Sequence, residues 1–496
     1  MTVVERQAVP LSHVDRFFIG GAWVEPTTDA VIDVVDPTTE ECFMRVPAAS
    51  AADMDRAIGA AREAFDHGPW PWLSHGERAD YLRQLGKAVA NRAEDVGQIW
   101  PRESGVLYKM AVGAGATAAV PFNAYADLAD TFAFEEPAQP TGGGAFGLLV
   151  REPVGVVGAI IPWNAPLSLL TQKVAPALLA GCTVVLKLSP EAPGEGYLVA
   201  EAAESIGLPP GVLNVLTADR EESELLVRDP RVDKITFTGS TATGRRIASL
   251  CGERIARCTL ELGGKSAAVI LDDADLEQAA KVLARSECFL SGQVCSSLTR
   301  IVVSENRHDE FAAALADVFS AMTVGDPFDP ATRLGPLTSA RQRDRVEGYI
   351  AKGVDQGATL VTGGGRPSHL DRGWFIEPTV FARVDNASAI AQEEIFGPVL
   401  GVIPASSEEE MVAIANDTIY GLNASVFTPD VERARTVARQ LRSGTVGHNA
   451  WRSDFGIAFG GFKQSGIGRE GGKEGLLHFL ETKTVILDDV PNGYGD

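Results

Sequence analysis

One cysteine of this chain stands in a setting that suits a reactive thiol. Cys295 lies in the stretch "FLSGQVCSSLTR", which follows a helix-like pattern and precedes the strand-like run "TRIVV". We therefore expect it in a loop between two elements, and loops on rigid scaffolds often carry nucleophiles such as a thiolate. The alternative is a small buried apolar side chain, which is the commoner role of a lone cysteine. We apply that alternative to the other five cysteines, Cys42, Cys182, Cys251, Cys258 and Cys288.

Three polar residues come at the ends of apolar, strand-like runs. Glu261 ends the run before "GGKS", and a carboxylate at the end of a parallel strand faces the crevice in which α/β proteins bind ligands. Asn164, in "IIPWNAPL", can donate a hydrogen bond into the same crevice, and Lys187 ends "CTVVLKL", where its ammonium can meet a ribose or a phosphate. The plainer alternatives are a solvated loop acid, a helix cap and a surface lysine, respectively.

Two glycine-rich stretches raise the question of phosphate binding. In "KITFTGSTATGRR" a β-like run ends at Gly239 and a helix-like pattern follows, so free N–H groups at the helix start can receive a phosphate. Arg245 and Arg246 stand where a P-loop has Lys and Ser/Thr, which disfavours nucleotide hydrolysis, and an ordinary strand-to-helix turn is the alternative. The stretch "GGGAFG" has GxGxxG spacing, but no strand precedes it and a β-like run follows it, so we interpret it as a linker.

The elements that must position these residues alternate between strand and helix. From residue 153 the β-like runs "VGVVGAII", "CTVVLKL", "GVLNVLT", "DKITFTG" and "CTLELGG" are separated by segments rich in helix formers that end at glycine. This alternation predicts a doubly wound parallel sheet with both faces covered. A second alternating set, from "SAAVIL" to about residue 460, predicts a second α/β unit beyond a boundary near Gly263 and Gly264. Residues 50–130 predict Ala-rich helices packed on the first sheet.

Composition limits the classes of function. A chain of 496 residues exceeds the size of one hydrophobic core, so two or three packed units are expected. The net charge of −22 opposes binding to nucleic acid or to an anionic membrane surface. The N-terminus lacks a secretory pattern and no apolar stretch is long enough to span a bilayer, so a cytoplasmic protein is expected. Six scattered cysteines without CxxC pairs predict reduced thiols and no metal site.

The motifs together are far more specific than any of them alone. "PWN", "FTGSTATG", "ELGGKS", "GQVC", "EEIFGPV" and "GGFKQSGIGRE" occur in the order and rough spacing of the aldehyde dehydrogenase superfamily, which the chain resembles from residue 18 to residue 481. The resemblance implies a Rossmann-like NAD(P)-binding domain at 1–137 and 153–263 and an α/β catalytic domain at 264–463. It also implies a small β oligomerisation element with the C-terminal tail, at 138–152 and 464–496, and hence a homodimer or homotetramer.

The resemblance further implies oxidation of an aldehyde to a carboxylic acid with NAD(P)+. Cys295 would attack the carbonyl carbon, the Asn164 amide and the Cys295 N–H would hold the oxyanion, and a hydride would leave for the nicotinamide. Glu261 would then activate the water that hydrolyses the thioester. CoA-acylating relatives generally lack this glutamate. Lys173 and Glu470 match a proposed proton path, with a structural ion pair as the alternative. The positions that match cofactor contacts are Ile160, Pro162, Trp163, Lys187, Gly239, Ser240, Gly244, Leu262, Gly263, Glu394 and Phe396.

Two departures from the family pattern bear on the cofactor and the substrate. Pro190 stands where many NAD-preferring members carry a glutamate on the adenosine ribose, and Glu191 comes one place later, so NAD is expected with NADP as the alternative. Ala165 stands where several members have a bulky aromatic residue, which predicts a roomier aldehyde pocket.

Three aromatic residues, Trp451, Phe455 and Phe459, match the loop that lines the substrate tunnel. An apolar or aromatic aldehyde is therefore expected, because such a pocket gains from apolar burial. Core packing is the alternative for these rings, and His448 is treated as structural.

Three other functions are compatible with parts of the pattern. A CoA-acylating or semialdehyde dehydrogenase would share the first half-reaction and would release a thioester when CoA is supplied. A binding or structural protein would keep the fold without turnover. A thiol hydrolase would need a histidine to activate Cys295, and none of the seven histidines lies near it in the sequence.

Overall fold

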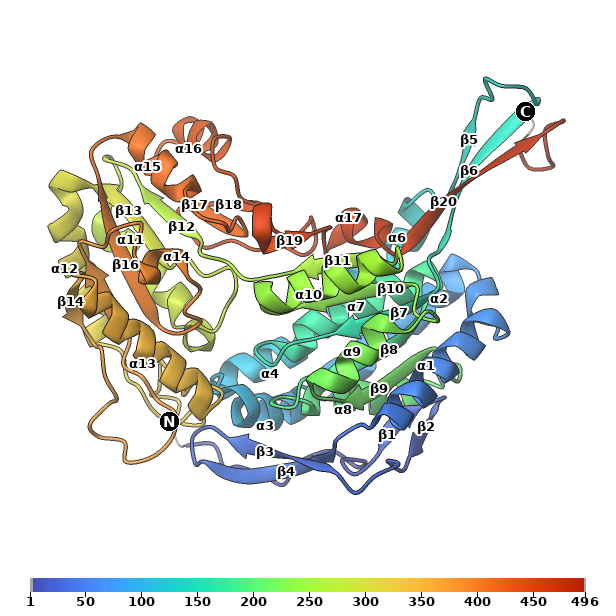
Figure 1. The fold of residues 1–496 in the computed structure, drawn as a ribbon, viewed down its shortest axis with the longest axis horizontal. Coiled ribbons are helices and arrows are strands. Elements are labelled where there is room, and N and C mark those ends of the chain that lie inside the picture. Colours follow the sequence, from blue (N-terminus) through green and yellow to red (C-terminus); the bar gives the residue numbers. More distant parts are fainter. Residues whose placement is uncertain (1–2, 495–496) are drawn as a thin grey trace.

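The computed structural model describes residues 3–494 and arranges them around two large sheets (Figure 1). The first is an eight-stranded sheet in the order β19-β11-β10-β7-β8-β9-β1-β2. Its strands are β1 (Phe17–Ile19), β2 (Ala22–Val24), β7 (Val156–Ile160), β8 (Thr183–Leu188), β9 (Leu213–Thr217), β10 (Lys234–Thr238), β11 (Arg257–Glu261) and β19 (Gly466–Ile467).

The five strands expected between residues 153 and 264 are confirmed as β7 to β11, and they pair in parallel with one another. Strands β1 and β19 join β9 and β11 in the antiparallel sense. Their side chains alternate between two cores: Val157 and Val184 enter one, whereas Val156 and Val185 enter the other. Continuous apolar runs suit strands that are buried on both faces. Strand β7 lies between β8 and β10, so the strand order reverses there, and a ligand crevice opens at such a point.

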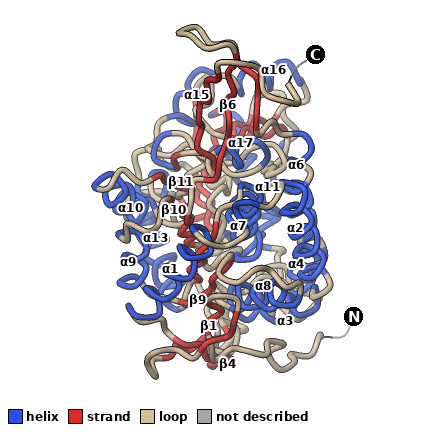
Figure 2. The backbone as a smooth tube through the Cα atoms, turned by 90° about the vertical axis from the view of Figure 1, so that its right-hand side faces the viewer, coloured by secondary structure: helices blue, strands red, loops and turns tan. Residues whose placement is uncertain are grey.

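Helices cover both faces of the first sheet (Figure 2). Helices α1, α9 and α10 pack together on one face, while α7 lies against β8 on the other face with α2, α5 and α8 around it. The predicted helices of residues 50–130 are thus confirmed. The bounds are α1 (Ala51–Asp66), α2 (His75–Ala90), α3 (Ala93–Ser104), α4 (Tyr108–Ala116), α5 (Ala119–Ala126), α6 (Leu128–Thr131), α7 (Pro166–Ala180), α8 (Gly194–Ser205), α9 (Arg220–Arg228) and α10 (Thr241–Glu253), with a 3-10 turn at Trp70–Trp72.

Local signals explain where several of these helices begin and end. Ser50 and Ser74 form capping boxes at the starts of α1 and α2, and the Ser240 hydroxyl accepts the Thr243 N–H at the start of α10. Gly181, with φ of 101°, ends α7 in the left-handed conformation. The expectation that α10 ends at glycine is wrong, because the helix continues through Gly252 to Glu253.

The second sheet has seven strands in the order β14-β15-β16-β13-β12-β17-β18 and confirms the predicted second α/β unit. Its strands are β12 (Ala267–Ile270), β13 (Arg300–Ser304), β14 (Thr359–Thr362), β15 (Thr379–Ala382), β16 (Val399–Ala405), β17 (Asn423–Phe427) and β18 (Thr445–His448). The helices that follow α10 are α11 (Leu276–Glu287), α12 (His308–Ser320), α13 (Ala340–Asp355), α14 (Ala389–Gln392), α15 (Glu408–Asn416), α16 (Val431–Ala438) and α17 (Gly472–Leu477), with 3-10 turns at Phe289–Gly292, Glu305–Arg307 and Lys463–Ser465.

A three-stranded antiparallel sheet projects from the body beside the C-terminal end of the chain (Figure 1). It consists of β5 (Glu135–Ala138), β6 (Phe146–Pro153) and β20 (Leu480–Leu487). A separate two-stranded sheet is formed in the N-terminal part of the chain by β3 (Val31–Asp36) and β4 (Glu41–Pro47). The linker interpretation of "GGGAFG" is wrong, because these residues form the turn between β5 and β6 and the start of β6. Before β20, the tail contributes β19 to the first sheet and packs α17 against α7.

Candidate active site

The chain crosses from the first sheet to the second between Glu261 and Ala267, and this crossing brings Cys295 and Asn164 into one cleft. Asn164 follows β7 at the carboxyl end of the first sheet, whereas Cys295 precedes β13 at the amino end of the second. Gly264, within the crossing, must be glycine, because a Cβ there would lie 2.3 Å from the Cys295 carbonyl oxygen. The two sheets thus meet end to end at the candidate nucleophile.

Cys295 lies in the loop expected from the sequence, after α11 and the turn at Phe289–Gly292. Its thiol is free, and the residue is half-buried. Burial raises the pKa of the thiol to about 12, and the carboxylates of Glu394 and Glu261 add to the shift. The thiol therefore keeps its proton at neutral pH and needs a base or a nearby positive charge to become a nucleophile.

Asn164 is buried, and its side-chain amide donates one hydrogen bond, 3.0 Å long, to the carbonyl of Gln293. A primary amide has two N–H donors, so one remains for a ligand in the cleft that Asn164 lines. The helix-cap alternative is wrong, because the N-cap of α7 is Ala165 and no side chain caps that helix.

Glu261 ends β11 and is 2% exposed, so the alternative of a solvated loop acid is wrong. Neither oxygen of its carboxylate has a hydrogen-bond partner within the described chain. Burial raises the pKa of Glu261 well above its usual range, and the nearby Glu470 carboxylate raises it further. A buried carboxylate without a hydrogen-bond partner lowers the stability of the fold, and such groups are typical of functional sites. A raised pKa suits a general base.

Lys173 and Glu470 form a buried ion pair, the arrangement that was the alternative to a proton path. The Lys173 ammonium also lies 3.5 Å from the Thr236 hydroxyl, and Glu470 contributes to the raised pKa of Glu261. The two charges therefore neutralise each other and also lie close to Glu261. This geometry fits both a structural ion pair and a proton path.

Breaking this pair is expected to destabilise the fold. Lys173→Met should lower the free energy of unfolding by about 3–5 kcal/mol, because Glu470 is left charged and unpaired in the core. Denaturant unfolding of the variant measures the loss. Changing both residues, Lys173→Met with Glu470→Gln, removes the unpaired charge and should recover most of it; a double variant no more stable than Lys173→Met would contradict this explanation.

A cleft of about 580 Å³, the first cleft, opens where the strand order reverses between β7 and β10. It is lined by six residues that match cofactor contacts, Ile160, Pro162, Trp163, Lys187, Gly239 and Ser240. Lys187 is 8% exposed, so the surface-lysine alternative is wrong, and burial lowers its pKa to about 8. The Thr238 hydroxyl also lines the first cleft and has no hydrogen-bond partner in residues 3–494. Such unmatched polar groups fit an incoming ribose or phosphate.

A second cleft, of about 440 Å³, shares Pro162, Trp163, Thr238, Gly239 and Ser240 with the first and continues to Cys295. Leu262, Gly263, Glu394 and Phe396, four more of the positions that match cofactor contacts, also line this second cleft. The Trp163 and Phe396 rings meet edge to face at 5.4 Å, and the Gly264 N–H donates to Glu394. Gly244 is different: it lines neither cleft and lets α10 pack closely against Leu262.

Several residues of the clefts were missed from the sequence, namely Asp219, Arg220, Ser223, Glu224, Arg246, Arg341, Gln342 and Arg345. Asp219 had a usable signal, because it follows the apolar strand β9 just as Asn164 follows β7. No sequence pattern indicated Arg341, because it lies on α13, more than 100 residues after the strands of the first sheet that border the first cleft.

The three residues predicted for the aldehyde pocket lie beside the candidate catalytic residues without lining either cleft. Ala165 adjoins Asn164, and the Trp451 indole donates to the Ser296 carbonyl at 3.1 Å, next to Cys295. Phe459 is 4% exposed and packs on Phe455 with ring centres 4.5 Å apart.

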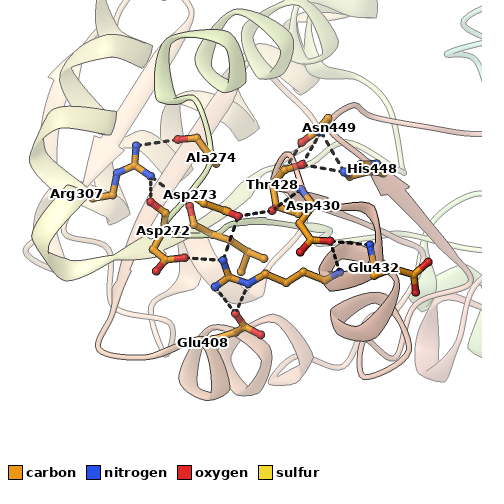
Figure 3. A network of polar contacts seen from close by, with 12 residues as sticks. Asp272, Asp273, Ala274, Arg307, Glu408, Thr428, Asp430, Glu432, His448 and Asn449 are labelled. Carbon is orange, nitrogen blue, oxygen red and sulfur yellow. Dashed lines mark hydrogen bonds and ion pairs between the residues drawn. The ribbon is translucent and has the colours of Figure 1, made fainter.

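His448 lies in a polar network at the carboxyl ends of β12, β17 and β18, the opposite end of the second sheet from Cys295 (Figure 3). Its Nε2 lies 2.9 Å from the Thr428 carbonyl oxygen. In the same network Arg433 pairs with Asp272 and Glu408, which ties α16 to the neighbouring loop and α15. These contacts stabilise the sheet end and do not reach the clefts.

The remaining cysteines fit the apolar interpretation only in part. Cys182, Cys251 and Cys288 are buried and Cys258 is half-buried, but Cys42 is exposed on β4. Within residues 3–494 no group of three or more His, Cys, Asp or Glu side chains is placed to hold a metal ion, and no helix there is long and apolar enough to cross a membrane.

Comparison with known proteins places this geometry in a family. The model of the "Aldehyde dehydrogenase family" matches residues 23–485. Geranial dehydrogenase of Castellaniella defragrans is 46% identical over 473 residues, 95% of this chain and 98% of the relative, and 3-succinoylsemialdehyde-pyridine dehydrogenase of a Pseudomonas species is 41% identical over 475 residues, again 95% and 98%.

Solved structures agree with these relatives. An aldehyde dehydrogenase of Mycobacterium tuberculosis in complex with NAD+ superposes with a TM-score of 0.93 at 47% identity, covering 97% of this chain and 99% of that one. A cysteine-to-alanine variant of aldehyde dehydrogenase C from Pseudomonas syringae, with NAD+ and octanal, has a TM-score of 0.93 at 38% identity and covers 98% and 99%. The chain therefore belongs to the aldehyde dehydrogenase family.

Proposed function

We propose that this aldehyde dehydrogenase oxidises apolar aldehydes to carboxylic acids with NAD+, through a thioester on Cys295 that water hydrolyses. One observation carries the proposal: Cys295 and Asn164 line a cleft that continues into the crevice at the strand-order reversal, and Glu261 stands buried and unpaired beside them. The nucleophile and the oxyanion donor thus face one cleft, and the Glu261 carboxylate, which lines neither cleft, is close enough to raise the pKa of the Cys295 thiol.

The first half-reaction uses Cys295 and Asn164. The Cys295 thiol passes its proton to solvent water as the sulfur adds to the carbonyl carbon, and the free Asn164 N–H together with the Cys295 backbone N–H stabilises the resulting oxyanion. Removal of one such donor typically costs about 2.7–4 kcal/mol of barrier. A bound dinucleotide would supply the acceptor for the hydride of the thiohemiacetal carbon. Trp163, Lys187 and Ser240 would hold its adenosine half in the first cleft, and Glu394 and Phe396 its nicotinamide half in the second.

The second half-reaction uses Glu261. Its carboxylate takes a proton from water, the hydroxide attacks the thioester carbon, and the carboxylic acid leaves as the thiol is restored. This step separates the proposal from a CoA-acylating enzyme, in which a thiol would take the acyl group. The unpaired Glu261 carboxylate favours hydrolysis.

The substrate class rests on the relatives and on nearby aromatic rings. One relative is named for geranial and one related structure contains octanal, both apolar aldehydes. In this chain Trp451 packs near Phe289 and contacts Ser296, next to Cys295. Phe455 packs on Phe459, whose backbone pairs with that of Glu470. We infer a pocket that gains affinity by burying apolar surface, with small Ala165 leaving room.

Glu191 supports the choice of NAD+ over NADP+. Its carboxylate lines the first cleft and accepts hydrogen bonds from Ser189 at 2.5 Å and Arg341 at 2.8 Å. Its charge also raises the pKa of Lys187, against the larger lowering by burial. A fixed negative charge at this end of the cleft repels a 2′-phosphate, although Pro190 occupies the usual position.

Neutralising this charge is expected to relax the cofactor preference. Glu191→Gln should improve the ratio of kcat/KM for NADP+ to that for NAD+ roughly 10-fold, since removal of one like charge is worth about 1.4 kcal/mol here. Steady-state kinetics with both cofactors measure the ratio. Glu347→Gln is the matched control, because Glu347 pairs with Arg366 outside both clefts; an unchanged ratio in Glu191→Gln would exclude the assigned role.

We also propose the division into domains stated above and a homodimer or homotetramer assembled through the projecting sheet of β5, β6 and β20. An exposed sheet edge that projects from the body is a natural site for pairing with another copy. A cytoplasmic location is proposed with it.

A panel of aliphatic, terpenoid, aromatic and amino aldehydes, each with NAD+ and NADP+, tests the proposed function. Initial rates should be highest for apolar aldehydes with NAD+, and the product should be the free acid whether or not CoA is present. A CoA thioester as product would replace hydrolysis with acyl transfer, and no reduced dinucleotide with any aldehyde would indicate a protein that has lost turnover.

A further inference from the structure

The candidate oxyanion donor is oriented by a loop that needs support. The Asn164 amide is held by the Gln293 carbonyl, and Gln293 lies two residues before Cys295. Just before it, Leu290, Ser291 and Gly292 all adopt left-handed conformations, with φ of 51°, 55° and 74°. Two of these three are not glycine, so the loop is strained and persists only where its surroundings hold it.

The side chain of Gln293 provides that support. It is 1% exposed, and its amide nitrogen donates to the Ser104 and Leu290 carbonyls at 3.3 Å and 3.0 Å. Its amide oxygen accepts the Thr338 N–H at 3.0 Å. One side chain therefore joins the loop to the end of α3 and to the segment before α13, and all its polar atoms are matched.

The end of α3 also fixes the backbone of Asn164. The Trp100 indole donates to the Asn164 carbonyl at 3.0 Å, and the Ser104 hydroxyl donates to the Trp163 carbonyl at 2.6 Å. Gln293 and Asn164 are thus anchored to the same helix end, so the distance between the Gln293 carbonyl and the Asn164 amide is set by one rigid element.

We propose that Gln293 is a positioning residue, which holds its own carbonyl where it fixes one N–H of Asn164 and so aims the other N–H at the substrate oxygen. The inference rests on the proposed function, because it assigns Asn164 to the oxyanion. Misplacement by about 1 Å can cost about 100-fold in rate, so the loss should appear in kcat.

A double-mutant cycle tests this role. Gln293→Met, which keeps the length of the side chain and removes its hydrogen bonds, should lower kcat about 10- to 100-fold with the KM for NAD+ unchanged. Asn164→Ala should lower kcat about 100- to 1,000-fold. In the Asn164→Ala background, Gln293→Met should lower kcat further by less than about twofold, because the group it positions is absent.

The control is Gln98→Met, since Gln98 is also a buried glutamine bonded to distant backbone, at Gln7 and Glu5, but does not contact the loop. It should leave kcat unchanged. If Gln293→Met does not fold, Gln293→Glu, of the same shape but unable to donate when charged, completes the cycle. Equal losses in both backgrounds, or no loss in kcat, would show that Gln293 does not act through Asn164. An unchanged kcat in Asn164→Ala would instead remove the oxyanion assignment itself.

Discussion

Replacement of Cys295 by alanine is expected to lower kcat for aldehyde oxidation at least about 10,000-fold, the scale on which nucleophile removal acts in covalent catalysis. Without the sulfur no thiohemiacetal forms. The hydrated aldehyde could still lose a hydride, but no covalent bond to the protein would hold its carbon in place. Binding of dinucleotide should be kept, because only the far end of the second cleft is changed. Reduced-dinucleotide formation measures the first effect, and titration of the protein's fluorescence with NAD+ measures the second.

Two further cysteine variants make that result specific. Cys42→Ala changes an exposed thiol on β4, and Cys258→Ala a half-buried thiol on β11. Both should keep kcat within about twofold, because surface and partly buried cysteines act as small apolar residues. Substantial turnover in Cys295→Ala would remove the covalent route.

The second large effect concerns Glu261. In Glu261→Gln the first half-reaction should proceed while hydrolysis of the thioester falls about 100- to 10,000-fold, the usual contribution of a general base. Rapid mixing with aldehyde and NAD+ should therefore give a burst of reduced dinucleotide, close to one per active site, followed by a stall. The wild-type enzyme should show no such stall.

The pH dependence gives this prediction a sign. Only the unprotonated carboxylate can take a proton from water, so the hydrolysis rate should rise with pH through the pKa of Glu261. Burial and Glu470 raise that pKa, so the limb should lie above the usual range for glutamate. The limb should vanish in Glu261→Gln. A steady rate like that of wild type, with no burst, would show that another group activates the water.

The fold was predictable where burial was uniform. Strands β7 to β10 are buried along their whole length, so their sequences read as continuous apolar runs and their positions were found to within a few residues. Strand β5 was missed because it is short and largely exposed, and the other partner of β6, β20, comes from more than 300 residues later. No local signal could reveal that pairing.

The site was predictable as a set of motifs and not as separate residues. Cys295, Asn164 and Glu261 each had a plainer explanation. Against these explanations, Cys295 lines a cleft, Asn164 does not cap α7, and the Glu261 carboxylate is buried and unpaired within the described residues. The support of the site lay beyond sequence reasoning, because Gln293 meets Ser104 and Asn164 across 189 and 129 residues. Such contacts depend on how the two sheets meet, which local patterns do not encode.

The central claim is that an acyl group is carried on the sulfur of Cys295, and mass spectrometry of the stalled Glu261→Gln enzyme tests it most directly. After incubation with octanal and NAD+, the peptide that contains Cys295 should gain the mass of the aldehyde less two hydrogens. The gain should require NAD+ and disappear on treatment with hydroxylamine. A stalled enzyme with Cys295 unmodified, or with the acyl group on another residue, would contradict the account.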